Sequence, residues 1–388
     1  MSQRGRLIVL FIVVLLVLTA GGCRRGADSL DPAPGPVTPE VGETEPLRVP
    51  DAERGEWGHY ALARMPEMPP CFRVAGWLDG ECLVGLSRDR VTVYNPFTRY
   101  TATVGETAWN VWPAPDGHRV AYNNEKGIYV VDVDTGTNTL VVRNAPGETS
   151  GPADFIWAPD GRRFLFSYAY EWDSGFFIHE FARDLTLELG TGMESYFLKQ
   201  AVAWPDPAMI LFTVRAAVTK DGTMEYGEGY RADFAVYNTA DDSFKRITDL
   251  EDGRFITYEG PAPAGRFAYL IRDREGRAAE TGLIDLNGVM LNRRTVDYSI
   301  SGLVASKTGG TTFYLQDVKR DGPGGITRLL IEHDGALLPV VEISHDAAFV
   351  QYRRSDDGRK LAFTFSSPMS RDGTDNGCFG YLLLDRSR

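Results

Sequence analysis

The chain has 388 residues, of which 43% are hydrophobic and 24% are charged, and its formal net charge is −12. This composition is typical of a globular protein with one large domain or two smaller ones. The acidic balance argues against a partner with a phosphate backbone, so we expect no nucleic acid partner. The four Cys and five His are scattered along the chain, which excludes a zinc ribbon or a disulfide scaffold. The many Gly, Pro, Tyr and Phe residues favour β structure.

The first 22 residues have the pattern of a secretory signal peptide. Two arginines precede the apolar run Leu7–Leu18, which is too short to span about 30 Å of hydrocarbon. The ending Ala20-Gly21-Gly22-Cys23 resembles a bacterial lipobox, with Ala20 where Leu is usual. This resemblance implies that Cys23 becomes the N-terminus and carries lipid, including a palmitate-type acyl chain. An ordinary signal peptide with a nearby Cys is the alternative.

Residues 23–56 are expected to form a disordered linker behind the lipid anchor. They contain an Asp-Pro-Ala-Pro-Gly-Pro stretch, several Glu and almost no aromatic residues. Such a segment buries too little apolar surface to offset the entropy of ordering it. The layout predicts a protein at the cell membrane, with the membrane as a partner through the lipid. The folded part would face the extracytoplasmic side.

Residues 57–388 carry a repeated unit of about four short strands. Its clearest copies are Val111–Tyr122 and Ile156–Phe166, each with an Ala-Pro-Asp-Gly turn between two apolar runs, and Arg354–Phe363 and Gly76–Gly80 are further copies. An Asp-Gly pair predicts a two-residue hairpin because it tolerates positive φ angles. The turns recur at roughly 40–50 residues, which is the spacing of propeller blades.

These repeats resemble the TolB-like and WD-like β-propeller superfamily, which implies an all-β fold. Seven blades are expected, with six and an irregular flank as the alternative. The last blade has only three strands before the chain ends, so we expect residues 58–64 to pair with the strand near Phe379–Leu384 and close the propeller. The expected units are 72–104, 108–143, 154–190, 200–248, 255–296, 300–342 and 347–386.

Long loops between the second and third strands of each unit are predicted to lie on one face, together with the connections between units. Binding sites concentrate on such loops, and exposed Trp and Tyr beside acids suit a protein, peptide or glycan ligand. Solvated loops without a function are the alternative. The candidate binding residues are Tyr170, Glu171, Trp172, Asp173, Glu225, Tyr226, Tyr230, Arg272, Arg320 and Arg371.

The sequence contains none of the common hydrolase, nucleotide or zinc motifs, so neither catalytic residues nor a cofactor or metal are predicted. The leading hypothesis is therefore a lipid-anchored binding or scaffold propeller. The alternative is a propeller hydrolase or lyase, of glycosidase type, that uses carboxylates at the central channel. Cys71 and Cys378 are expected to start strands at the same face, where they form a possible disulfide, whereas Cys71 and Cys82 start at opposite ends of neighbouring strands. Free thiols are the alternative.

Overall fold

The fold is almost entirely β. The computed structural model describes residues 60–144, 154–169, 174–189, 197–216, 219–220, 223–224, 231–251, 253–297, 299–305, 312–319, 325–333, 336–345, 349–355, 357–366 and 379–385. The only helical element in these ranges is a short 3-10 turn at Phe181–Arg183. Among the same residues, no helix is long and apolar enough to cross a membrane.

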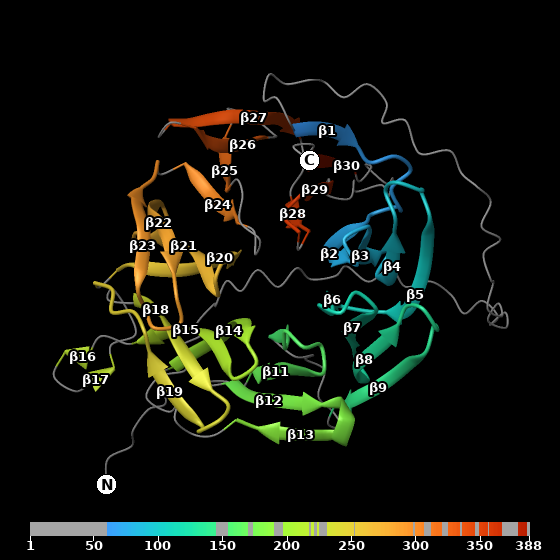
Figure 1. The fold of residues 1–388 in the computed structure, drawn as a ribbon, viewed down its shortest axis with the longest axis horizontal. Coiled ribbons are helices and arrows are strands. Elements are labelled where there is room, and N and C mark those ends of the chain that lie inside the picture. Colours follow the sequence, from blue (N-terminus) through green and yellow to red (C-terminus); the bar gives the residue numbers. More distant parts are fainter. Residues whose placement is uncertain are drawn as a thin grey trace, which may run out of the picture. The chain divides into compact units, whose positions relative to one another are not determined.

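Three four-stranded antiparallel sheets come first along the chain (Figure 1). Each contains consecutive strands paired with their neighbours, so every sheet is a meander. The first sheet has β2 (Arg73–Leu78), β3 (Cys82–Ser87), β4 (Arg90–Tyr94) and β5 (Thr101–Thr107). The second has β6 (Asn110–Pro113), β7 (Arg119–Asn124), β8 (Gly127–Asp132) and β9 (Asn138–Arg143). The third has β10 (Phe155–Trp157), β11 (Arg163–Ala169), β12 (Ser174–Glu180) and β13 (Leu185–Glu188).

An eight-stranded sheet follows, and it consists of two meanders of four strands each. One parallel bridge, between Ala232 and Phe255, joins the two halves. The first half has β14 (Phe197–Asp206), β15 (Met209–Ala216), β18 (Arg231–Asn238) and β19 (Ser243–Arg246), and the small hairpin β16 (Thr219–Lys220) and β17 (Thr223–Met224) lies between β15 and β18 in the chain. The second half has β20 (Phe255–Ala262), β21 (Arg266–Arg272), β22 (Ala278–Ile284) and β23 (Met290–Thr295).

Two more four-stranded sheets complete the described structure. The first has β24 (Ile300–Val304), β25 (Phe313–Lys319), β26 (Gly325–His333) and β27 (Ala336–His345). The second combines β28 (Phe349–Arg354), β29 (Lys360–Ser366) and β30 (Phe379–Asp385) with β1 (Tyr60–Arg64) from the other end of the chain. In Figure 1, β1 is blue and its partner β30 is dark red. Their register runs antiparallel from Tyr60↔Asp385 to Arg64↔Tyr381, and β30 is the strand predicted to receive residues 58–64.

Apolar clusters hold each sheet or half-sheet against the next one. Strands of the first and second sheets share a cluster that includes Val84 and Val120, and similar clusters follow at every later junction. A further cluster, with Phe72, Leu83 and Leu382, packs the last sheet against the first. Burying one such side chain stabilises the fold by roughly 1.5–3 kcal/mol, so these junctions supply most of the core.

The Asp-Gly turns differ from the predicted two-residue hairpins in most sheets. At Asp116-Gly117 only the glycine has a positive φ, of 78°. Its N–H donates to Ala114 O, and Asp116 Oδ1 accepts the N–H groups of His118 and Arg119. The same pattern recurs at Asp160 and Asp357. The segment around each of these Asp-Gly pairs therefore forms a loop longer than a two-residue hairpin, in which the Asp side chain accepts hydrogen bonds from backbone N–H groups. Only at Asp79-Gly80 are both φ angles positive, as the prediction required.

A cation placed just after this turn clamps one sheet to the next. The Arg119 guanidinium donates to Gly161 O at 2.6 Å and lies over Trp157, with 5.7 Å to the ring centroid. Arg163 repeats this geometry with Pro207 O and Trp204 of the following sheet. Lys360 of the last sheet does the same with Gly80 O and Trp77 of the first. Each clamp joins a charge-assisted hydrogen bond to a cation–π contact.

Candidate functional site

Each meander of four strands begins with a strand at one of its edges, and we call these the leading strands: β2, β6, β10, β14, β20, β24 and β28. Of these, β20 also pairs with β18 through a single bridge. The leading strands contact one another directly, for example β28 with β2, β2 with β6 and β20 with β24. In Figure 1 the leading strands that are labelled lie on the inner side of their sheets: β2, β6, β14, β20, β24 and β28. Polar side chains gather where β20, β24, β28 and β2 meet.

Glu259 on β20 reaches across to the next leading strand. Its Oε2 accepts the N–H of Leu303 on β24 at 3.0 Å, and its Oε1 accepts the Thr257 hydroxyl at 2.6 Å. Burial raises the pKa of Glu259 above its usual range, although both hydrogen bonds and the nearby Arg272 act in the opposite direction. The carboxyl group of Glu259 therefore loses its proton at a higher pH than the carboxyl group of an exposed glutamate.

Gly302 on β24 leaves a space that Glu259 and Tyr352 share. A Cβ atom at this position would lie 2.7 Å from Tyr352 Oη and 3.4 Å from Glu259 Oε2, so both oxygens approach the same point. Tyr352 comes from β28, and burial together with the Glu259 charge raises its pKa to about 12. Its hydroxyl has no hydrogen-bond partner among the described residues and remains a free donor.

Arg353 follows on β28 and faces the first sheet. Its Nε donates to Ala75 O at 2.6 Å and its Nη1 to Tyr352 O at 2.8 Å, while Trp77 Nε1 donates to Arg353 O at 2.9 Å. The side chain is exposed, yet the surrounding protein lowers the pKa of the guanidinium. No carboxylate of the described residues forms an ion pair with it. Its charge is therefore uncompensated in a partly enclosed place, which suits an anionic group of a ligand.

Asp154, just before β10, links the third sheet to β14. Its Oδ2 accepts the Ser167 hydroxyl at 3.1 Å and the N–H of Ala201 on β14 at 3.4 Å. Burial raises its pKa to about 6. Asp154 and Glu259 thus perform the same bridging task at two different junctions.

Of the predicted binding residues, the structure describes only Arg272. It lies at the end of β21, where its guanidinium donates to Gly276 O at 3.1 Å and to Ser301 O at 2.5 Å. Arg272 therefore ties the loop after β21 to β24, beside Glu259. The other candidates lie outside the described residues: Tyr170, Glu171, Trp172, Asp173, Glu225, Tyr226, Tyr230, Arg320 and Arg371.

Sequence reasoning missed Glu259, Tyr352 and Arg353, and it also missed Trp109. Trp109 stands between β5 and β6 and is 39% exposed, so it adds an aromatic side chain to the face with the connections between sheets. The sequence feature that could have indicated Glu259, Tyr352 and Arg353 is an ionisable residue within a predicted apolar strand. Among the described residues, no group of three or more His, Cys, Asp or Glu side chains is placed to hold a metal ion.

No protein-family model matches the chain, and a search of curated proteins finds no match. Solved structures do match. An oligogalacturonate lyase in complex with manganese aligns over 87% of this chain and 96% of its own, with 12% identity and a TM-score of 0.61. TolB from Acinetobacter baumannii covers 85% of this chain and 65% of its own at 15% identity, with a TM-score of 0.42.

The β-propeller domain of the Trilobed protease from Pyrococcus furiosus also matches, over 85% of this chain and 93% of its own, at 12% identity and a TM-score of 0.49. At such identities a likeness concerns the fold alone. The successive antiparallel meanders and the likeness to the lyase indicate a fold of the β-propeller type.

Proposed function

We propose that the chain is a lipid-anchored, extracytoplasmic β-propeller that binds a protein, peptide or glycan ligand through the leading strands and the loops beside them. One observation carries the binding proposal: the Arg353 guanidinium donates to two backbone carbonyl groups and forms no ion pair with a carboxylate of the described residues. Such a guanidinium suits a carboxylate or another anionic group of a ligand. The ligand is therefore an acidic peptide or an acidic glycan.

The proposal includes seven blades closed into a ring. Each half of the eight-stranded sheet counts as one blade, because a single parallel bridge joins two complete meanders. The apolar cluster and the Lys360 clamp between the last and first sheets support closure, as does the pairing of β1 with β30. Closure removes two open sheet edges.

The anchor is part of the proposal and rests on residues 1–23. Cys23 would carry two acyl chains, because one chain alone binds a membrane only marginally. We expect Cys23→Ser to release the protein from membranes or to leave the precursor unprocessed. Fractionation and the mass of the mature N-terminus provide the readout. Unchanged processing and membrane retention in this variant would contradict the lipid anchor.

The binding proposal is tested with the mature chain against arrays of acidic peptides and glycans. One acidic glycan probe is oligogalacturonate, which we choose because it appears in the name of the structurally similar lyase. We expect Arg353→Gln to weaken binding at least tenfold, since a charge-assisted contact is lost. The matched control is Arg162→Gln, which removes an exposed charge at a turn of the third sheet. Equal affinity of the wild type and Arg353→Gln for every ligand would refute this site.

A propeller lyase or hydrolase is the second candidate. The observation that favours it is the raised pKa of Glu259 beside the Tyr352 hydroxyl, because acid–base catalysis needs such a tuned pair. The test incubates the protein with oligogalacturonate and follows the absorbance of unsaturated products. Product formation that Glu259→Gln abolishes would favour the enzyme, whereas binding without turnover would favour the binding module.

A further inference from the structure

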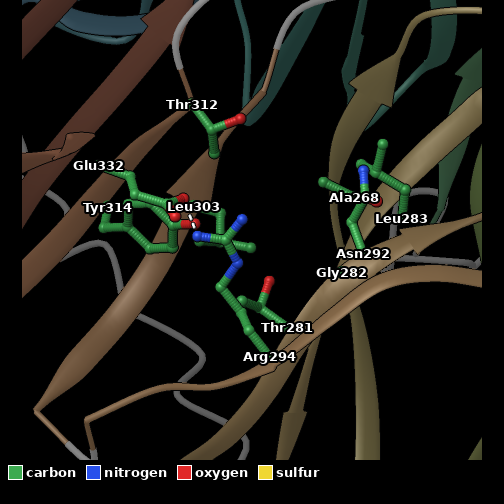
Figure 2. Close-up of a pocket in the computed structure, with 10 residues that line it drawn as sticks. All are labelled: Ala268, Thr281, Gly282, Leu283, Asn292, Arg294, Leu303, Thr312, Tyr314 and Glu332. Carbon is green, nitrogen blue, oxygen red and sulfur yellow. Dashed lines mark ion pairs between the residues drawn. The ribbon is translucent and has the colours of Figure 1, made fainter. Parts of the chain in front are cut away.

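A cavity of about 440 Å³ lies between the sheet half β20–β23 and the sheet β24–β27. Its volume is within the range of about 300–1,000 Å³ that is typical of small-molecule sites. Its lining comes from β21, β22 and β23 of the half-sheet and from the first three strands of the next sheet with the residue before β25, and Arg353 is not part of it. Figure 2 shows its lining: Ala268, Thr281, Gly282, Leu283, Asn292, Arg294, Leu303, Thr312, Tyr314 and Glu332.

The backbone is irregular at one wall of this cavity. The register between β22 and β23 shifts between Thr281 and Leu283, so β23 bulges at this point. Asn292, in the bulge, has a φ of 52°, a left-handed conformation that asparagine adopts more readily than most other residues. Bulges often lie next to functional sites, where they change the direction in which a side chain points.

Gly282, opposite the bulge, allows the close approach of its neighbours. A Cβ atom there would lie 2.7 Å from Leu291 O and 2.8 Å from Tyr269 Oη. The strands can therefore adopt this register only because residue 282 lacks a side chain.

The cavity has a polar side and an apolar side. An ion pair between Arg294 on β23 and Glu332 on β26 bridges the two sheets, with Tyr314 beside it (Figure 2). Thr281 and Asn292 add a hydroxyl and an amide. Ala268, Leu283 and Leu303 supply apolar surface. Arg294 and Glu332 are the only charged residues of the lining, so its net charge is zero.

We propose that this cavity binds a neutral mono- or disaccharide, at a site separate from the anionic site at Arg353. A guanidinium and a carboxylate side by side present planar donors and acceptors, which match adjacent hydroxyl groups of a sugar. The C–H face of the sugar fits the apolar side. A charged sugar is disfavoured, because it would have to break the ion pair or leave a charge uncompensated.

Calorimetry of the mature protein with D-glucose, D-galactose and maltose tests the site, with D-glucuronate and D-glucosamine as charged counterparts. We expect a neutral sugar to bind at least tenfold more tightly than its charged counterpart. Glu332→Gln should weaken neutral-sugar binding at least tenfold. The matched control is Glu342→Gln, because Glu342 pairs with Arg328 at 2.7 Å on the same sheet, outside the cavity.

A second variant, Thr312→Val, removes one lining hydroxyl without touching the ion pair and should weaken binding several-fold even if Glu332→Gln fails to fold. Arg353→Gln should leave neutral-sugar binding unchanged, which separates this site from the anionic one. The proposal is overturned if no neutral sugar binds, if the charged sugars bind as tightly, or if folded Glu332→Gln and Thr312→Val retain full affinity.

Discussion

At the scale of single residues, two carboxyl groups join neighbouring leading strands by accepting a backbone N–H. Asp154 accepts from Ala201, and Glu259 accepts from Leu303. Each contact provides a hydrogen-bond acceptor for one backbone N–H group of an edge strand, which would otherwise have to donate to water. Its cost is the partial burial of an ionisable group, which is visible in the raised pKa values of both residues.

This cost makes the stability depend on pH through Asp154. Its pKa rises from an ordinary value of 3.8 to about 6 in the folded state, so the folded protein binds more protons between these values. The contribution of Asp154 to the free energy of unfolding therefore falls as the pH rises through this window and stays low above it. We expect Asp154→Asn, whose amide oxygen can accept the same bonds, to be more stable than the wild type at pH 7 by on the order of 1–3 kcal/mol.

The measurement is urea unfolding of both proteins from pH 4 to pH 7. The difference between the two proteins in the free energy of unfolding should be small at pH 4 and should grow towards pH 7. A difference that is constant over this range would show that Asp154 titrates as an exposed carboxyl group.

At the scale of elements, the predicted units agree with the observed sheets to within a few residues. The second unit, expected at 108–143, corresponds to β6–β9 at Asn110–Arg143. Alternating apolar strands and Pro-Asp-Gly turns carry enough local information for this agreement. The details of the turns were wrong at Asp116, Asp160 and Asp357, because the Asp side chain accepts backbone donors and stabilises a longer loop.

The clamps between sheets could not be predicted in the same way. Lys360 meets Trp77, and nearly the whole chain separates them, so only the three-dimensional packing brings them together. The same holds for Glu259, Gly302 and Tyr352, which come from three sheets. The pattern of a strand shows that a residue lies at the edge of its own sheet, but it does not show which strand of another sheet that residue contacts.

The Lys360 clamp makes a prediction at this scale. We expect Lys360→Gln to lower the free energy of unfolding by about 1–2 kcal/mol, because it removes a charge-assisted hydrogen bond and a partly buried cation–π contact. Lys245→Gln is the control, since Lys245 is exposed on β19. Thermal unfolding of the two variants and the wild type gives the comparison. Equal melting temperatures of the two variants would mean that the Lys360 clamp does not contribute to the stability of the fold.

At the scale of the whole molecule, the pairing of β1 with β30 connects the two ends of the folded chain. Removing residues 24–56 should leave the melting temperature unchanged, whereas removing residues 24–64 takes β1 away and exposes β30 as an edge. We expect the second truncation to melt several degrees lower. If both truncations melt together, β1 does not contribute to the stability of the last sheet.

The Cys71–Cys378 disulfide remains a prediction, because Cys378 lies outside the described residues. Phe72, the neighbour of Cys71 in the chain, belongs to the same apolar cluster as Leu382 of β30. Cys82 is free, and Asn95 Nδ2 donates to its Sγ at 3.6 Å, which excludes the Cys71–Cys82 pair. Mass spectrometry of the digested, non-reduced protein should find a peptide that links Cys71 to Cys378. Full alkylation of Cys71 without reduction would rule the disulfide out.

The place of β1 also sets the order in which the molecule can be completed. β1 is the first described strand to be synthesised and β30 is the last, so β1 has no partner until the ribosome has synthesised β30. Until then the growing protein carries a strand with unsatisfied backbone groups and a first sheet without its neighbour. Such long-range pairing slows folding and prolongs exposure to wrong partners.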